Sequence, residues 1–90
     1  MSLDELEALL LTHPRIADAA VIGIHADDGE EVPRAFVVKQ AGADLGDGDV
    51  MEFVAGHVAP FKRVRSVEFV EVIPKSASGK ILRRELRARG

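Results

Sequence analysis

The sequence predicts an α+β fold in which helices cover a small three-stranded sheet, in the order helix, strand, strand, helix, strand, helix. Two observations support this class. Two segments repeat apolar residues at helical spacing and a third is a short basic helix, whereas three short apolar runs have the composition of strands. With 90 residues, the chain has room for one modest core, which buries about 60 to 65% of the surface of the unfolded chain. We therefore expect a single domain over residues 1–90.

The first half of the chain is predicted to form a helix and then a hairpin. Ser2 begins a capping box, and leucines repeat on one helical face until Pro14 ends the helix. Apolar runs at residues 19–24 and 34–39 predict two strands. The acidic, glycine-containing segment 27–31 is expected to form the loop between them.

The second half is predicted to add a helix, a strand and a last helix. Residues 42–48 form a polar turn, after which Asp49 is expected to cap a helix that ends near Pro60. Residues 67–70 read as a third strand, because β-branched and aromatic residues dominate there. Residues 81–89 are expected to form a short basic helix.

Composition excludes several classes of site. The chain has no Cys, which removes disulfides, thiolate metal sites and cysteine nucleophiles. Its three histidines are scattered rather than paired at ligand spacing, so we expect no metal site. No apolar run approaches the roughly 18 residues that a membrane span requires, and the acidic segment 2–7 is unlike a signal peptide. We expect a cytoplasmic protein.

Charge is distributed unevenly along the chain. Residues 1–61 hold 12 acidic and 3 basic groups, whereas residues 62–90 hold 9 basic and 3 acidic groups. A basic end of this kind attracts nucleic acid, an acidic partner or a small phosphate-bearing ligand. The chain has no Trp or Tyr for base stacking, so a small anion fits this end better than nucleic acid.

Lys80 is the strongest candidate for a chemical role. It ends the segment Pro74-Lys-Ser-Ala-Ser-Gly-Lys80 and directly precedes the predicted last helix. Serine and glycine favour turns, so we expect a short, mobile tether that presents Lys80 to an anionic ligand, with Gly79 permitting close approach. A phosphate-binding P-loop is excluded, because its first glycine and its Ser/Thr are replaced by Pro74 and Ile81. The remaining alternative is an ordinary solvated turn.

Five segments together resemble one family. The chain is similar to the C-terminal domain of adenylate-forming acyl-CoA synthetases, the group of 4-coumarate-CoA ligase, fatty-acyl-CoA ligases and firefly luciferase. The resemblance covers essentially the whole chain, in order and at family spacing. It is carried by Glu5-Leu-Glu-Ala-Leu-Leu-Leu-Thr-His-Pro14, Asp18-Ala-Ala-Val-Ile-Gly23, Gly29-Glu-Glu-Val-Pro-Arg-Ala-Phe-Val37, Phe61-Lys-Arg-Val64 and Pro74-Lys-Ser-Ala-Ser-Gly-Lys-Ile-Leu-Arg83.

The resemblance implies a two-step reaction. In the family, a carboxylic acid and ATP, with Mg²⁺, give an acyl-adenylate and pyrophosphate, and coenzyme A then displaces AMP to form a thioester. The C-terminal domain is a mobile lid on a large N-terminal domain. By this resemblance Lys80 is the catalytic lysine of adenylation, Gly79 lies beside the nucleotide, and Lys62 matches a family lysine near coenzyme A. The acid and ATP pocket would belong to the N-terminal domain, so we expect no catalysis from this chain alone.

Two other functions remain open. One is the lid of a carrier-protein-linked adenylation domain, although there the loop typically reads Leu-Thr-x-Asn-Gly-Lys, unlike residues 74–80. The other is a non-catalytic α+β module that binds an acidic partner through residues 62–90. Salt-dependent binding to generic DNA would favour this last function.

Overall fold

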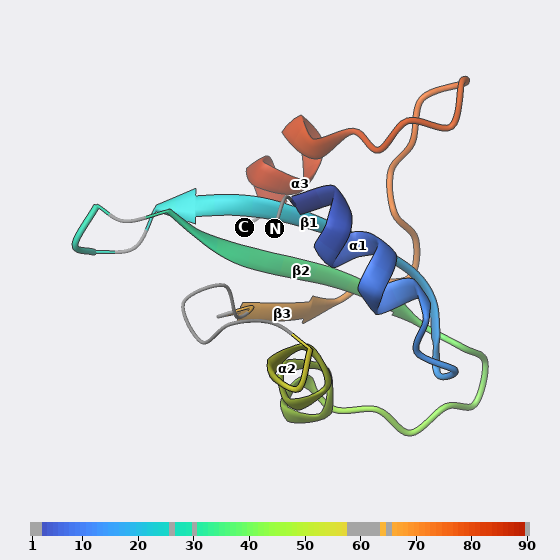
Figure 1. The fold of residues 1–90 in the computed structure, drawn as a ribbon. Coiled ribbons are helices and arrows are strands. Elements are labelled where there is room, and N and C mark those ends of the chain that lie inside the picture. Colours follow the sequence, from blue (N-terminus) through green and yellow to red (C-terminus); the bar gives the residue numbers. More distant parts are fainter. Residues whose placement is uncertain (1–2, 26, 30, 58–63, 65, 90) are drawn as a thin grey trace.

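The computed structural model describes residues 3–25, 27–29, 31–57, 64 and 66–89. Within them the chain forms three helices and three strands in the predicted order, which confirms the α+β class (Figure 1). The elements are α1 (Leu3–Leu11), β1 (Ile16–His25), β2 (Glu31–Lys39), α2 (Asp47–Ala55), β3 (Ser66–Phe69) and α3 (Arg83–Arg89).

The sheet is mixed, with the strand order β1-β2-β3. The strands β1 and β2 pair antiparallel as the predicted hairpin, and β3 pairs parallel to β2. A parallel pair needs a long connection, and the segment containing α2 supplies it. The register of β1 on β2 shifts between Ile16 and Asp18, so that Ala17 is an extra residue at the start of β1.

Apolar side chains cover both faces of the sheet, because alternate residues of a strand point to opposite faces. On one face, residues of β1 and β2 pack with α1 and α2; on the other, a smaller group packs with α3. The first cluster is Leu6, Leu10, Ile16, Ala19, Val21, Ala35, Val37, Leu45, Val50, Val54 and Val64. The second is Ala20, Ile22, Phe36, Ile73 and Leu86. Figure 1 shows α3 on the opposite side of the sheet from α2.

Two predicted helix starts were wrong. Asp49 does not cap α2 from outside: it is the third helical residue, and its Oδ2 accepts a hydrogen bond from the N–H of Gly46, 2.9 Å away. The helix ends at Ala55, and Pro60 lies outside the described residues. The last helix begins at Arg83 rather than Ile81, because Ile81 instead forms a bridge with Lys75.

The strands were placed correctly but too short at their ends. β1 extends by three residues before and one after the predicted run, and β2 begins three residues earlier. Pro33 lies in β2 opposite Gly23, between the segments that the sequence pattern assigned to the loop and to the strand. The third strand is shifted by one residue, to Ser66–Phe69.

Candidate functional site

The predicted Lys80 loop is a closed hairpin rather than a loose tether. Its turn is held by hydrogen bonds from the Gly79 N–H to the Ser76 carbonyl (2.9 Å) and from the Ser76 N–H to the Lys80 carbonyl (2.8 Å). The base is held by the Leu82 N–H, which donates to the carbonyl of Pro74 at 2.9 Å. A three-residue loop ending in a left-handed glycine is a common hairpin connection. The sequence therefore fixes the backbone on both sides of Lys80.

Gly79 has the conformation that this turn requires. Its φ is +86°, in the left-handed region that costs a side-chain-bearing residue free energy. A Cβ at this position would meet no atom within 4 Å, so the requirement comes from the backbone rather than from crowding. The glycine thus sets the direction in which the chain enters Lys80.

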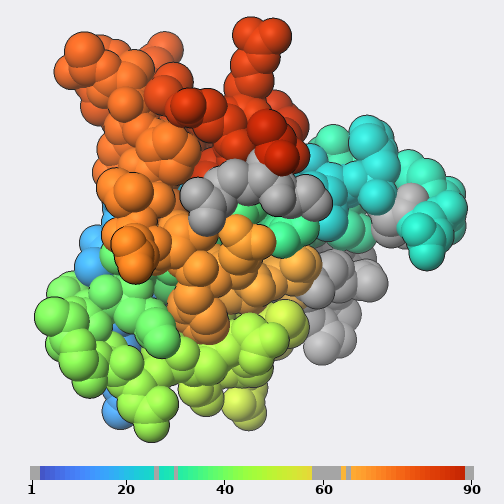
Figure 2. All heavy atoms as spheres, turned by 180° about the vertical axis from the view of Figure 1, so that it is seen from behind, coloured from blue at the N-terminus to red at the C-terminus, as the bar shows by residue number. Residues whose placement is uncertain are grey.

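Lys80 is exposed, and no carboxylate among the described residues pairs with its ammonium. The hairpin projects from the body of the molecule, at the upper right in Figure 1 and at the upper left in the view from behind in Figure 2. The amide N–H of Lys80 donates to the Ser76 hydroxyl oxygen at 3.3 Å. The Ser76 and Ser78 hydroxyls lie 2.9 Å apart. An unpaired cation at the tip of a projecting turn is suited to an external anion.

Charged side chains attach the base of this hairpin to β1. Lys75 Nζ lies 2.7 Å from Asp18 Oδ2. On the other limb, Arg83 Nη2 lies 2.8 Å from Glu7 Oε1, and Arg83 Nε donates to the carbonyl of Val21 at 3.3 Å. Both ends of the hairpin therefore contact the same strand.

Glu7 is the buried charged residue of the described chain, with 7% of its surface exposed. Besides contacting Arg83, its Oε2 accepts the N–H of Val21 at 2.6 Å. The sequence carries a signal for this site in the helical pattern of α1. Glu7 stands four residues after Leu3 and three before Leu10, on the apolar face of α1. A carboxylate on a core-facing helix surface requires a cationic or hydrogen-bonding partner.

The other expected site residues do not add to the Lys80 hairpin. Lys62 lies outside the described residues. Its role near coenzyme A stays a prediction. Within the described part of the chain, no group of three or more His, Asp or Glu side chains is placed to hold a metal ion. Nor does any described helix have the length and apolar character that crossing a bilayer requires.

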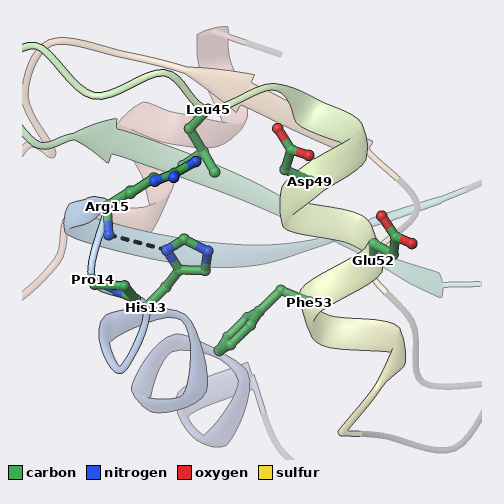
Figure 3. Close-up of a pocket in the computed structure, with 7 residues that line it drawn as sticks. All are labelled: His13, Pro14, Arg15, Leu45, Asp49, Glu52 and Phe53. Atoms are coloured by element: carbon green, nitrogen blue, oxygen red, sulfur yellow. Dashed lines mark hydrogen bonds between the residues drawn. The ribbon is translucent and has the colours of Figure 1, made fainter.

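A separate hollow lies between the turn that follows α1 and one side of α2 (Figure 3). Its volume is about 470 Å³, and it is lined by His13, Pro14, Arg15, Leu45, Asp49, Glu52 and Phe53. The His13 and Phe53 rings meet edge to face with centroids 4.9 Å apart, and His13 Nδ1 accepts the Arg15 N–H at 3.0 Å. This hollow contains neither Lys80 nor Gly79, so it is not part of the hairpin site.

Comparison with known proteins shows which family this chain matches. The family model described as AMP-binding enzyme C-terminal domain matches residues 5–80. The 4-coumarate:CoA ligase 1 of Petunia hybrida is 54% identical over 85 residues, which are 94% of this chain and 16% of that protein. This chain thus spans about a sixth of the length of that relative.

Solved structures agree with the sequence match. The crystal structure of the anthranilate CoA ligase AuaEII in complex with anthranoyl-AMP superimposes with a TM-score of 0.86 at 32% identity, covering 99% of this chain and 18% of that one. The amide bond synthetase McbA from Marinactinospora thermotolerans gives a TM-score of 0.91 at 31% identity, with the same coverage of 99% and 18%.

Proposed function

This chain belongs to the AMP-binding enzyme C-terminal domain family of adenylate-forming acyl-CoA ligases, and on that premise we propose that it is the mobile lid of such a ligase. In this proposal it supplies Lys80 for ATP-dependent acyl-adenylate formation and then reorients for thioester formation with coenzyme A. The observation that carries the proposal is the exposed Lys80, which pairs with no carboxylate of the described residues and stands on a closed, projecting hairpin.

The first half-reaction needs a positive charge at the reacting atoms. When a carboxylate attacks the α-phosphate of ATP, two anions approach each other, and negative charge develops on the phosphate oxygens. An ammonium about 3 Å away, at an effective dielectric constant near 20, offsets roughly 5 kcal/mol of this repulsion. Lys80 is suited to this, since no described carboxylate neutralises its charge.

The hairpin also supports withdrawal after the first step. Lysine binds phosphate as a point charge on a flexible stem, so it leaves its ligand without breaking a bidentate contact. The hairpin has its own backbone hydrogen bonds and projects from the sheet (Figure 1). It can therefore move as a unit with the domain when the lid turns.

ATP, Mg²⁺ and coenzyme A enter this proposal as ligands of the whole enzyme. The described residues offer no carboxylate cluster that fits Mg²⁺, so we place the metal and most ATP contacts on an N-terminal domain that would be the partner of this chain. Gly79 would lie beside the nucleotide, and Lys62 would approach coenzyme A. The carboxylic acid would be selected by that N-terminal domain. We also propose a cytoplasmic location and a role in fatty acid metabolism.

The test is a chimera in which this chain replaces the matching segment of the petunia 4-coumarate:CoA ligase 1. The unmodified chimera should form coumaroyl-CoA, whereas the 90-residue chain alone should release no pyrophosphate. Lys80→Ala should slow ATP-pyrophosphate exchange by at least ~100-fold, because it removes charge stabilisation at the reacting phosphate. Conversion of synthetic coumaroyl-AMP with coenzyme A should change much less.

Arg84→Ala is the matched control, because it removes an exposed cation four residues from Lys80. It should leave both half-reactions near normal. Equal losses in the two half-reactions of Lys80→Ala, or a normal first step, would contradict the role proposed for Lys80. An inactive unmodified chimera would contradict the lid function itself.

One solved structure suggests a second reaction, the formation of an amide bond. McbA, which superimposes with a TM-score of 0.91, is an amide bond synthetase, so the acyl acceptor of the second step is open to amines as well as thiols. The chimera distinguishes these acceptors if coenzyme A and simple amines are supplied in parallel. The relatives with the higher identity are CoA ligases, which favours coenzyme A.

A further inference from the structure

The hairpin that carries Lys80 is joined to β1 by a charged contact on each of its limbs. Lys75 precedes the turn and contacts Asp18, and Arg83 follows it and contacts Val21 and Glu7. From this arrangement we propose that Lys75 and Arg83 are positioning residues that hold the hairpin so that Lys80 reaches the reacting phosphate. This proposal rests on the lid function proposed above.

The contact on the entering limb uses an irregularity in the sheet. Asp18 follows the extra residue at the start of β1, and such bulges commonly redirect a side chain. Its Oδ1 accepts the N–H of Ala19 at 2.9 Å, which orients the carboxylate and leaves Oδ2 for Lys75 at 2.7 Å. Asp18 is therefore a fixed acceptor rather than a freely rotating surface carboxylate.

The contact on the leaving limb uses the free edge of β1. Within the described chain β1 pairs only with β2, so one edge of β1 has no strand beside it. At Val21 this edge is occupied by side chains: the N–H donates to Glu7 at 2.6 Å and the carbonyl accepts from Arg83 Nε at 3.3 Å. Arg83 and Glu7 are themselves joined at 2.8 Å. This pair takes the place of a neighbouring strand and fixes the start of α3.

Two contacts constrain the hairpin more than one would. Asp18 and Val21 are three residues apart on one strand, a separation of about 10 Å. A single contact would leave the hairpin free to pivot about it, whereas two separated contacts fix its direction as well as its position. A misplacement of about 1 Å at a reacting group can cost ~100-fold in rate. The remaining freedom of Lys80 is then that of its own side chain.

Lys75 gives the sharper test, since its contact is partly exposed, with 40% of the Lys75 side chain accessible. Exposed ion pairs contribute little to global stability, so Lys75→Met should fold normally, with a thermal midpoint within about 2 °C of the unmodified chain. Arg83→Ala would leave Glu7 buried without its cation and is expected to disturb the fold itself. Arg84→Met is the matched control, because it removes the same charge from the same region without a described ion pair.

The first measurement uses the 90-residue chain and does not depend on any enzyme activity. Amide hydrogen exchange should rise about two- to threefold at Ser76, Gly79 and Leu82 in Lys75→Met, because these N–H groups close the hairpin and an exposed ion pair contributes only a fraction of a kcal/mol. The amides of β2 should be unchanged. Lys75→Arg should keep the original exchange rates, since a guanidinium can still bind Asp18, and so should Arg84→Met.

The second measurement uses the chimeric ligase. Lys75→Met should lower kcat for ATP-pyrophosphate exchange by ~10 to 100-fold and leave the coumaroyl-AMP step within about threefold, with recovery in Lys75→Arg. Unchanged hairpin exchange, or equal losses in both half-reactions, would overturn the proposal. If the unmodified chimera were inactive, the lid function would fail, and the exchange experiment alone would decide whether the contacts hold the hairpin.

Discussion

At the scale of single residues, a small number of polar contacts join elements of the described structure in addition to the apolar core. Glu7 is one of them, because it accepts the Val21 N–H and pairs with Arg83 from a buried position. Its carboxylate joins three elements: α1, β1 and the start of α3. A buried charge with all its partners in place is tolerated, whereas removing one partner leaves an uncompensated group.

Glu7→Gln should therefore destabilise the chain by about 1 to 3 kcal/mol, because the amide keeps an acceptor for Val21 but loses the charge that Arg83 pairs with. Urea denaturation followed by circular dichroism measures the change. Glu71→Gln, at an exposed position, is the control and should shift stability by less than about 0.5 kcal/mol. A similar small shift for Glu7→Gln would mean that this ion pair does not stabilise the fold.

Two glycines should respond to alanine in opposite directions. Gly79→Ala places a Cβ on a residue with φ of +86° and should destabilise the chain by about 1 kcal/mol. Gly48→Ala lies inside α2, has no positive φ and would meet no atom within 4 Å. It should stabilise the chain by about 0.5 kcal/mol, through helix propensity. Thermal melting of both variants tests the pair, and shifts of the same sign would refute the conformational explanation.

At the scale of elements, α3 is attached to the sheet through one apolar residue and one charged residue. Leu86 is fully buried and packs in the smaller cluster with residues of β1 and β2, among them Ile22 and Phe36. Arg83 supplies the polar contact to β1. The position of α3, and with it the exit of the Lys80 hairpin, depends on both.

Leu86→Ala should cost about 2 to 4 kcal/mol of folding free energy, because it leaves a cavity between α3 and the sheet. Chemical denaturation measures this loss. Val72→Ala is the control: Val72 is 70% exposed and its truncation should cost less than about 0.5 kcal/mol. Comparable losses in the two variants would mean that α3 does not contribute to the core as described.

The order and type of all six elements could be predicted from the sequence, because apolar periodicity reports which residues face a core. The ends of elements could not. The start of α3 is set by the bridge between Lys75 and Ile81, which lie six residues apart across a turn, and no helical pattern reports it. Lys80 and Gly79 were predicted by their turn chemistry, whereas the contacts of Lys75 and Arg83 depend on which residues of β1 the fold brings beside them.

At the scale of the whole molecule, the uneven charge of the sequence becomes complementarity between its two parts. Lys75 pairs with Asp18, and Arg83 pairs with Asp4 and Glu7, so two cations of residues 62–90 meet carboxylates of residues 1–61. The pair of Arg34 with Glu68 has the opposite polarity. Part of the basic C-terminal third is therefore neutralised within the chain. This reduces the positive surface available to a nucleic acid.

We accordingly predict weak binding to generic duplex DNA, with a Kd above about 100 µM at physiological salt, which is the weak limit of non-specific binding. Fluorescence anisotropy with a labelled duplex measures it, and lowering the salt concentration provides the internal control. Micromolar binding with a steep salt dependence would instead favour the non-catalytic module that binds acidic partners.

The sheet separates two cores of unequal size, with eleven buried residues beside α1 and α2 and five beside α3 among the described residues. Free energies of local opening follow the buried apolar contacts that hold each unit. The α3 side is therefore the first cooperative unit to open, at a cost below that of global unfolding. Since the Lys80 hairpin leads into α3, each such opening releases one limb of the hairpin while the larger core stays folded. The chain thus carries its proposed reactive group beside the smaller core, where local opening costs less free energy.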